Sequence, residues 1–150
     1  MENETRKYAV LAVSRSEKFS AALRALLPAG RYDPLETVSC GREAKERLSG
    51  SRFDIAIIND PLPDLSGETL ATEVCRDSGA GVLLLVKADD FPAVTQRVSP
   101  HGVLTLPKPT TETMIAQSLM LLCGTRERLR RLEERAVSME EKMVEIRIVN

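Results

Sequence analysis

The sequence predicts an α/β fold built on a doubly wound, five-stranded parallel sheet. Short apolar runs alternate with segments of helical periodicity along most of the 150 residues. In these runs apolar residues follow one another and do not alternate with polar ones, which is typical of parallel strands that are buried on both faces. In such a fold helices cover both faces of the sheet, and the functional site lies at the carboxyl ends of the strands.

The first unit begins with the run YAVLAV at residues 8–13, which predicts a buried strand. Residues 16–27 then place four large apolar side chains at helical spacing, and Ser16 is the expected N-cap. Pro28 and Gly30 end this helix, because proline and glycine both interrupt helical backbone.

The second and third units follow the same order. Residues 34–39 predict a weaker strand, and residues 41–50 predict a short charged helix closed by Gly50. The third strand is expected at 53–59, and the helix after it at 67–79.

The last two units complete the sheet. Residues 81–86 are the most continuously apolar run and predict the fourth strand, whereas 91–99 predict only a short helix. The fifth strand is expected at 102–107, with a helix from residue 110 or 111. Its expected sheet-facing stripe is Met114, Ile115, Ser118, Leu119 and Leu122.

Composition excludes several classes of function. A formal net charge of −1 gives no field that would draw nucleic acid to the chain as a whole. The three cysteines are scattered and odd in number, which favours a reducing, cytoplasmic compartment over a disulfide framework or a metal site. The amino terminus is polar and no apolar run approaches membrane length, so we expect a soluble protein without a signal peptide.

The candidate site consists of the residues that follow four of the predicted strands. Ser14 and Arg15 follow the first strand, Asn59 ends the third, Lys87 follows the fourth and Lys108 follows the fifth. Because parallel strands end at one edge of the sheet, these five side chains are expected to line one pocket.

These residues carry a resemblance to the receiver domain of two-component response regulators, over roughly residues 6–123. The receiver signature is an aspartate at the end of strand three, a proline four residues later, a glycine eight residues later, and a Lys-Pro pair after strand five. The flavodoxin-like receiver fold follows from the resemblance. The positions of the signature are occupied here by Asn59, Pro63, Gly67, Lys108 and Pro109.

The departures from this pattern change what the resemblance implies. A receiver accepts a phosphoryl group on the strand-three carboxylate, with Mg²⁺ held by that group and an acidic pair after strand one. Here Asn59 replaces the acceptor, Ser14 and Arg15 replace the acidic pair, and Lys87 replaces a hydroxyl residue. Only Lys108 remains. We therefore expect a degenerate phosphoacceptor pocket with no metal, no cofactor and no enzymatic activity.

Two questions about the pocket stay open at the level of sequence. Asp60 is an alternative acceptor, although a one-residue offset along a strand should turn it to the other face. The cations of the pocket hold either an anion or nearby carboxylates, and internal charge pairing is the favoured interpretation. The candidate partners are Asp60, Asp64, Asp89 and Asp90.

The tail of the chain has a heptad pattern. From residue 122 onward, mostly apolar residues recur at alternate steps of three and four, which is typical of a coiled coil. In a parallel pair, Arg128 would face Glu133 of the partner and Arg135 would face its Glu140, whereas Lys142 would face Arg147 unfavourably. The series is Leu122, Thr125, Leu129, Leu132, Ala136, Met139, Met143, Ile146 and Asn150.

The tail therefore predicts a homodimer through the C-terminal helix, with a hinge at Gly124. The division expected is a receiver-like domain at 1–123 and an amphipathic helix at 124–150 that leads to an output domain beyond this chain. The alternative is a helix that packs on its own domain or on a following one.

Residues 132–150, LEERAVSMEEKMVEIRIVN, resemble the helical lead-in of the ANTAR type of RNA-binding antitermination domain. The resemblance implies an RNA-binding output, so that RNA is contacted only through that domain. The alternatives are a DNA-binding output, control by a regulatory protein partner, or a receiver phosphorylated on Asp60. A conventional switch is not expected, because Thr105 replaces the aromatic switch residue of strand five.

Overall fold

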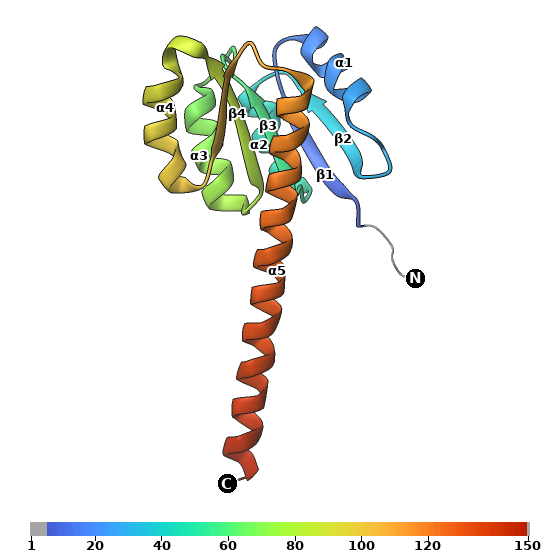
Figure 1. Ribbon diagram of the computed structural model, residues 1–150, viewed down its shortest axis with the longest axis vertical. Helices are drawn as coiled ribbons and strands as arrows, with labels where there is room; N and C mark the ends of the chain where they lie inside the picture. The colour runs from blue at the N-terminus through green and yellow to red at the C-terminus, as the bar shows by residue number, and fades with distance from the viewer. Residues whose placement is uncertain (1–5, 150) are drawn as a thin grey trace.

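The computed structural model describes residues 6–149, and it describes side-chain surroundings for residues 6–144. A five-stranded parallel sheet with the order β2-β1-β3-β4-β5 forms the centre of the molecule (Figure 1), which confirms the predicted fold class. Its strands are β1 (Tyr8–Val13), β2 (Tyr32–Val38), β3 (Ile55–Asn59), β4 (Gly81–Lys87) and β5 (Leu104–Lys108).

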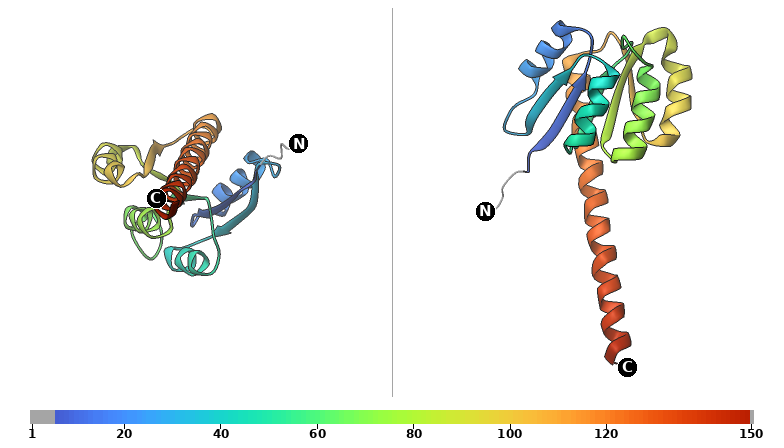
Figure 2. Two further views of the ribbon diagram at one scale, coloured as in Figure 1. Left: turned by 90° about the horizontal axis from the view of Figure 1, so that it is seen from below. Right: turned by 180° about the vertical axis from the view of Figure 1, so that it is seen from behind.

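Helices cover both faces of the sheet, as buried parallel strands require. Two helices lie on one face and three on the other (Figure 2). The first face carries α1 (Glu17–Leu26) and α5 (Glu112–Val149). The second carries α2 (Gly41–Gly50), α3 (Gly67–Ser78) and α4 (Phe91–Val98), with the short 3₁₀ turns η1 (Ala88–Asp90) and η2 (Ser99–His101) before and after α4.

The helix ends follow from local side chains. The hydroxyl of Ser16 accepts a hydrogen bond from the Phe19 amide at 3.2 Å, so the predicted N-cap of α1 is confirmed. Gly79 ends α3 in the left-handed conformation at φ 72°, which glycine adopts without steric cost. The helix predicted over residues 41–50 is confirmed: Gly50 is the last helical residue of α2, and the chain turns to extended backbone at Ser51.

The core is divided by the sheet into two clusters, because neighbouring strand residues point to opposite faces. Ile55 and Ile57 face α1 and α5, whereas Ile58 faces α2 and α3. The central strands carry almost nothing but fully buried aliphatic residues, which explains why they read as continuous apolar runs in the sequence.

The α5 helix packs on the sheet through four of the five residues predicted for its apolar stripe. Ile115, Ser118, Leu119 and Leu122 are buried. The prediction was wrong for Met114, whose side chain is 44% exposed. Successive helical residues are turned by about 100°, so Met114 lies on the flank of the helix when Ile115 faces the sheet.

The whole of α5 is a single helix of 38 residues, and its C-terminal part extends well past the sheet (Figure 1). The hinge predicted at Gly124 is not present, because the helix runs through this position without a break. Within residues 6–149, no helix is both long enough and apolar enough to cross a membrane.

Polar contacts hold α5 on the domain directly after Gly124. The Arg126 guanidinium donates to the Gly79 carbonyl at 2.6 Å and to the Asp54 carboxylate at 3.3 Å. The carboxylate of the next residue, Glu127, accepts a hydrogen bond from the Tyr8 hydroxyl at 3.1 Å. These bonds fix the direction in which the helix leaves the sheet, since they lie where it departs.

Replacing Leu119 with alanine tests how strongly α5 depends on the sheet. Leu119 is fully buried, so Leu119→Ala should lower the free energy of unfolding by about 2–5 kcal/mol. The neighbouring Met120 is 56% exposed, and Met120→Ala should change stability by less than about 0.5 kcal/mol. Urea unfolding followed by circular dichroism measures both. Equal losses would contradict the packing of α5 described here.

Candidate functional site

The candidate site lies where β1, β3, β4 and β5 end at one edge of the sheet. Asn59 is the last residue of β3 and Lys108 the last of β5, whereas Ser14 follows β1 directly. The register pairs Lys87 with Lys108, so the ends of β4 and β5 are level. The parallel sheet therefore brings these residues to one edge, although they are far apart in the sequence.

Ser14, Asn59 and Lys108 form a continuous chain of hydrogen bonds. The Lys108 ammonium donates to the Asn59 side-chain carbonyl at 2.9 Å, and the Asn59 amide nitrogen donates to the Ser14 hydroxyl at 3.0 Å. Lys108 also donates to the main-chain carbonyl of Asp60. The buried Ser14 hydroxyl accepts in addition from the Ser16 amide at 3.0 Å.

This arrangement suits an amide in the position of Asn59. Its carbonyl oxygen accepts a hydrogen bond from Lys108 and its amide nitrogen donates one to Ser14, so both ends of the group are used. An amide has no negative charge with which to attack a phosphorus atom or to bind a divalent cation. The group at the centre of the pocket therefore serves as a hydrogen-bonding link.

The environment of Lys108 lowers its pKa below the usual lysine value. Burial is the main cause, because desolvation disfavours the charged ammonium. The positive charge of Lys87 lowers the pKa further, and the negative charge of Asp60 opposes the shift. The Lys108 ammonium is thus influenced by one positive and one negative charge, and it donates hydrogen bonds to two neutral oxygens.

The Asp60 side chain is used in the loop that leads to α3. Its carboxylate accepts a hydrogen bond from the Gly67 amide at 2.8 Å. A Cβ atom on residue 67 would lie 2.5 Å from the same carboxylate oxygen, so only glycine fits beside this contact. The glycine of the strand-three motif is therefore explained by close packing against Asp60.

Arg15 and Lys87 are exposed, with Arg15 directly after Ser14 and Lys87 at the end of β4. In the described part of the chain, no carboxylate comes within 4.0 Å of the charged atoms of Arg15, Lys87 or Lys108. Among the described residues these cations therefore form no close ion pair of the expected kind, and of the expected carboxylates Asp60 acts on Lys108 through its charge alone. Asp64, one of the expected partners, instead accepts from the Gly41 amide at the start of α2, at 2.9 Å.

Two other expected partners, Asp89 and Asp90, line a separate cleft of about 380 Å³ between α3 and α4. Asp60 reaches the same cleft, together with Arg97. Among the residues with described side chains, no three or more His, Cys, Asp or Glu groups converge in a way that would hold a metal ion.

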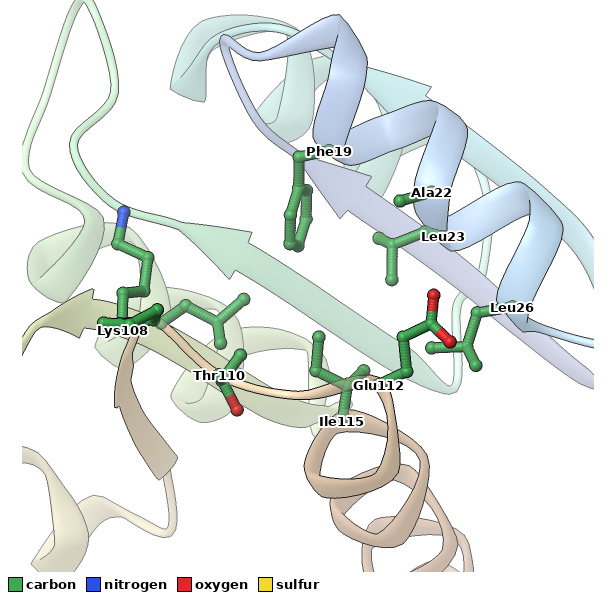
Figure 3. A pocket seen from close by; sticks show the side chains of 10 residues that line it. Phe19, Ala22, Leu23, Leu26, Lys108, Thr110, Glu112 and Ile115 are labelled. Carbon is green, nitrogen blue, oxygen red and sulfur yellow. The ribbon is translucent and has the colours of Figure 1, made fainter.

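An apolar hollow of about 270 Å³ adjoins the site between α1 and the start of α5 (Figure 3). Phe19 and Leu23 line it from α1, Ile115 lines it from α5, and Lys108 lies at one end. Sequence reasoning did not identify this hollow, because each helix was considered against the sheet alone. The signal was present in Phe19 and Leu26, which are only partly covered by the sheet.

The opposite flank of the site is held by side chains of α4. The Thr105 hydroxyl of β5 lies 2.6 Å from that of Thr95 in α4, and Thr105 is buried. Arg97 of α4 makes two hydrogen bonds to the Glu68 carboxylate of α3, at 2.7 and 2.9 Å. Sequence reasoning singled out Thr105 but not Thr95, because only the folded chain pairs the two hydroxyls.

Neither a family model nor a curated protein matches the chain. Solved structures do. The chemotaxis response regulator CheY4 of Vibrio cholerae is 25% identical with a TM-score of 0.67, over 78% of this chain and 99% of that one. The signal receiver domain of an HD domain-containing protein from Pseudomonas fluorescens Pf-5 is 20% identical with a TM-score of 0.75, over 87% and 97%. A structure named adenylate cyclase, from Rhodopirellula baltica, is 18% identical with a TM-score of 0.77, over 86% and 96%.

These likenesses show that the chain has the receiver fold, as the sequence motifs predicted. The level of identity shows the fold alone.

The charges around Lys108 make a testable prediction about its pKa. Lys87→Met should raise the Lys108 pKa, because it removes a neighbouring positive charge. Asp60→Asn should lower it, because the favourable carboxylate charge is lost while the amide oxygen still accepts from Gly67. Titration of the Lys108 side-chain carbon resonance by NMR measures both shifts. Shifts of the same sign in the two variants would contradict the arrangement described.

Proposed function

We propose that this chain is a receiver-type signalling module that acts through protein contacts and self-association, independently of phosphorylation. One observation carries the proposal: the Lys108 ammonium is already hydrogen-bonded to the Asn59 amide and to the Asp60 carbonyl. In a receiver the corresponding lysine would meet a phosphoryl group carried by a carboxylate. Here the lysine and the amide hold each other, and no phosphoryl group is needed to complete the site.

The residues around this pair support the same proposal. Phosphoryl transfer depends on Mg²⁺ and on positive groups that neutralise charge on the transferred oxygens. Ser14 and Arg15 supply no carboxylate for the cation, and the Asn59 amide supplies no nucleophile. The proposed module is therefore not an enzyme and uses neither a metal nor another cofactor.

A second candidate is a receiver that is phosphorylated on Asp60. One observation favours it: the negative charge of Asp60 is near enough to Lys108 to oppose the lowering of the lysine pKa. Against it, an oxygen of this carboxylate is bound to the Gly67 amide, and the acidic pair that would hold Mg²⁺ is replaced. We therefore place it second.

The tail of α5 supports self-association. Leu129, Leu132, Met139 and Met143 are each at least 51% exposed, and Ala136 is exposed beside them. Ile146 belongs to the same predicted series but lies outside the residues whose side chains are described. A row of exposed apolar side chains on a long helix is costly in water unless another helix covers it. A homodimer is the proposed state.

The output that we propose is an RNA-binding antitermination domain joined through α5, in the cytoplasm. It is supported by the resemblance of residues 132–150 to the lead-in of such domains and by the helical state of this segment up to Val149. A DNA-binding output fits the same architecture. A protein partner of the domain would then change the geometry or the population of the dimer, and through it the output.

Treatment with acetyl phosphate and Mg²⁺ tests independence from phosphorylation. The intact mass of the protein should not increase, and its amide spectrum should not change on addition of beryllofluoride. Asn59→Asp should behave in the same way, because it restores a carboxylate without the acidic pair that binds the metal. A phosphoryl adduct that Asp60→Asn abolishes would establish the second candidate instead.

Replacing one stripe residue with a charge tests the proposed dimer. Leu132→Glu should raise the dissociation constant of the dimer by at least about tenfold, because it would bury an unpaired carboxylate between the helices. Ser138→Glu is the matched control, since this exposed residue lies on the far side of the helix and should change the constant by less than about twofold. Sedimentation equilibrium measures the constants. A wild-type chain that stays monomeric at high concentration would refute the dimer.

A further inference from the structure

The apolar surface of α5 does not begin where the helix leaves the domain. Met114 and Leu121, both within the part of α5 that packs on the sheet, are 44% and 60% exposed. The core is reached from this segment by other residues, among them Ile115 and Leu122. The domain portion of the helix thus has two apolar faces, and the sheet covers only one of them.

The exposed face continues into the tail along one line. Leu121, Leu132 and Met139 follow Met114 by 7, 18 and 25 residues. At 3.6 residues per turn these separations are about 2, 5 and 7 whole turns, so the four side chains lie above one another along the helix. Thr125, Leu129, Ala136 and Met143 lie beside this line within about 60°. We call this set of residues the α5 stripe.

The stripe differs from the heptad series that the sequence predicts. That series begins at Leu122, but Leu122 is only 8% exposed and packs on the sheet, so a partner cannot reach it. Leu121 takes its place on the exposed side, and the order becomes Leu121, Thr125, Leu129, Leu132. Two successive steps of four residues form a stutter, which locally unwinds a coiled coil and lets two helices run nearly straight.

We propose that a second copy of this chain packs in parallel along the whole stripe, so that Met114 and Leu121 of the two copies meet beside the domains. The proposal deepens the dimer proposed above and rests on it. It adds that the dimer contact includes the domain portion of α5. In a two-fold pair the same stripe is used by both copies, which is why a self-complementary apolar line suits this partner.

The charges that flank the stripe favour a second copy in parallel orientation. In this orientation Arg128 faces Glu133 of the second copy, and Arg135 faces its Glu140. Arg128 and Arg135 are exposed in the single chain, as are both glutamates, so they are free to make these contacts. An antiparallel pair would place Leu121 against the distant tail and lose these matches.

The position of the stripe also leaves room for the second helix. Leu121 is turned about 100° from Leu122, which faces the sheet, so the partner would approach from the flank of α5 and not from the side that its own domain fills. Gly124, which has no side chain, and the small Thr125 lie at this level and permit close approach of two helices. The two domains would then stand side by side at the top of one helix pair.

Charge substitutions on adjacent residues test this inference. Leu121→Glu should raise the dissociation constant of the dimer by at least about tenfold, as Leu132→Glu should, because both residues would lie in one buried seam. Met120→Glu is the matched control: it is an exposed apolar residue of the same turn, directed about 100° away, and should change the constant by less than about twofold. Circular dichroism checks that each variant folds.

Disulfide formation reads the orientation directly. In a background with Cys40→Ser and Cys75→Ser, Leu121→Cys should be crosslinked between two copies by mild oxidation, and Met120→Cys should not. The remaining Cys123 is buried on the sheet. Two cysteines at position 121 meet only in a parallel pair, because an antiparallel pair separates them along the helix.

The outcomes separate this inference from the dimer on which it rests. If Leu132→Glu weakens association and Leu121→Glu does not, the contact is confined to the tail and the inference is wrong, whereas the dimer stands. If neither variant weakens association, both proposals fail. Crosslinking at position 120 in place of 121 would also overturn the inference, since it would assign a different face of α5 to the second copy.

Discussion

The hydrogen bond between the Lys108 ammonium and the Asn59 amide is the contact on which the interpretation of the site depends. It joins the ends of β3 and β5 across the edge of the sheet, and the Asn59 amide extends it to Ser14 after β1. Burial disfavours the charged lysine, and two neutral oxygens compensate it. Three strand ends are thus held together by hydrogen bonds between groups of the chain itself.

Most of the fold could be predicted from the sequence, because apolar strand runs and capped helices are local signals. Ser16, for instance, caps α1 as expected. The errors arose where a residue depends on distant packing. Met114 fits a helical apolar pattern, yet the part of α5 that contacts the sheet is too narrow to include it, so it lies on the flank of the helix. Gly124 reads as a hinge, yet Arg126 and Glu127 hold the next turn on the domain, so the helix continues.

The candidate site was predictable in position but not in its bonds. Parallel strands end at one edge, so Ser14, Asn59 and Lys108 were expected together. The direction of Asp60 toward the Gly67 amide, and the absence of carboxylates within ion-pairing distance of the cations in the described residues, depend on loop geometry that sequence spacing does not encode. The Thr95–Thr105 contact likewise needs α4 and β5 in place.

The α5 helix connects the two parts of the molecule that carry the proposed function. Its inner face completes the core through Leu119, and Arg126 fixes its direction by binding the Gly79 carbonyl and Asp54. Its outer face carries the α5 stripe. Because one unbroken helix has both faces, a tilt of the domain relative to α5 would have to break the Arg126 contacts or bend the helix. Under the proposed function, a partner that binds the domain would therefore influence the helix pair mainly by moving whole domains as rigid bodies.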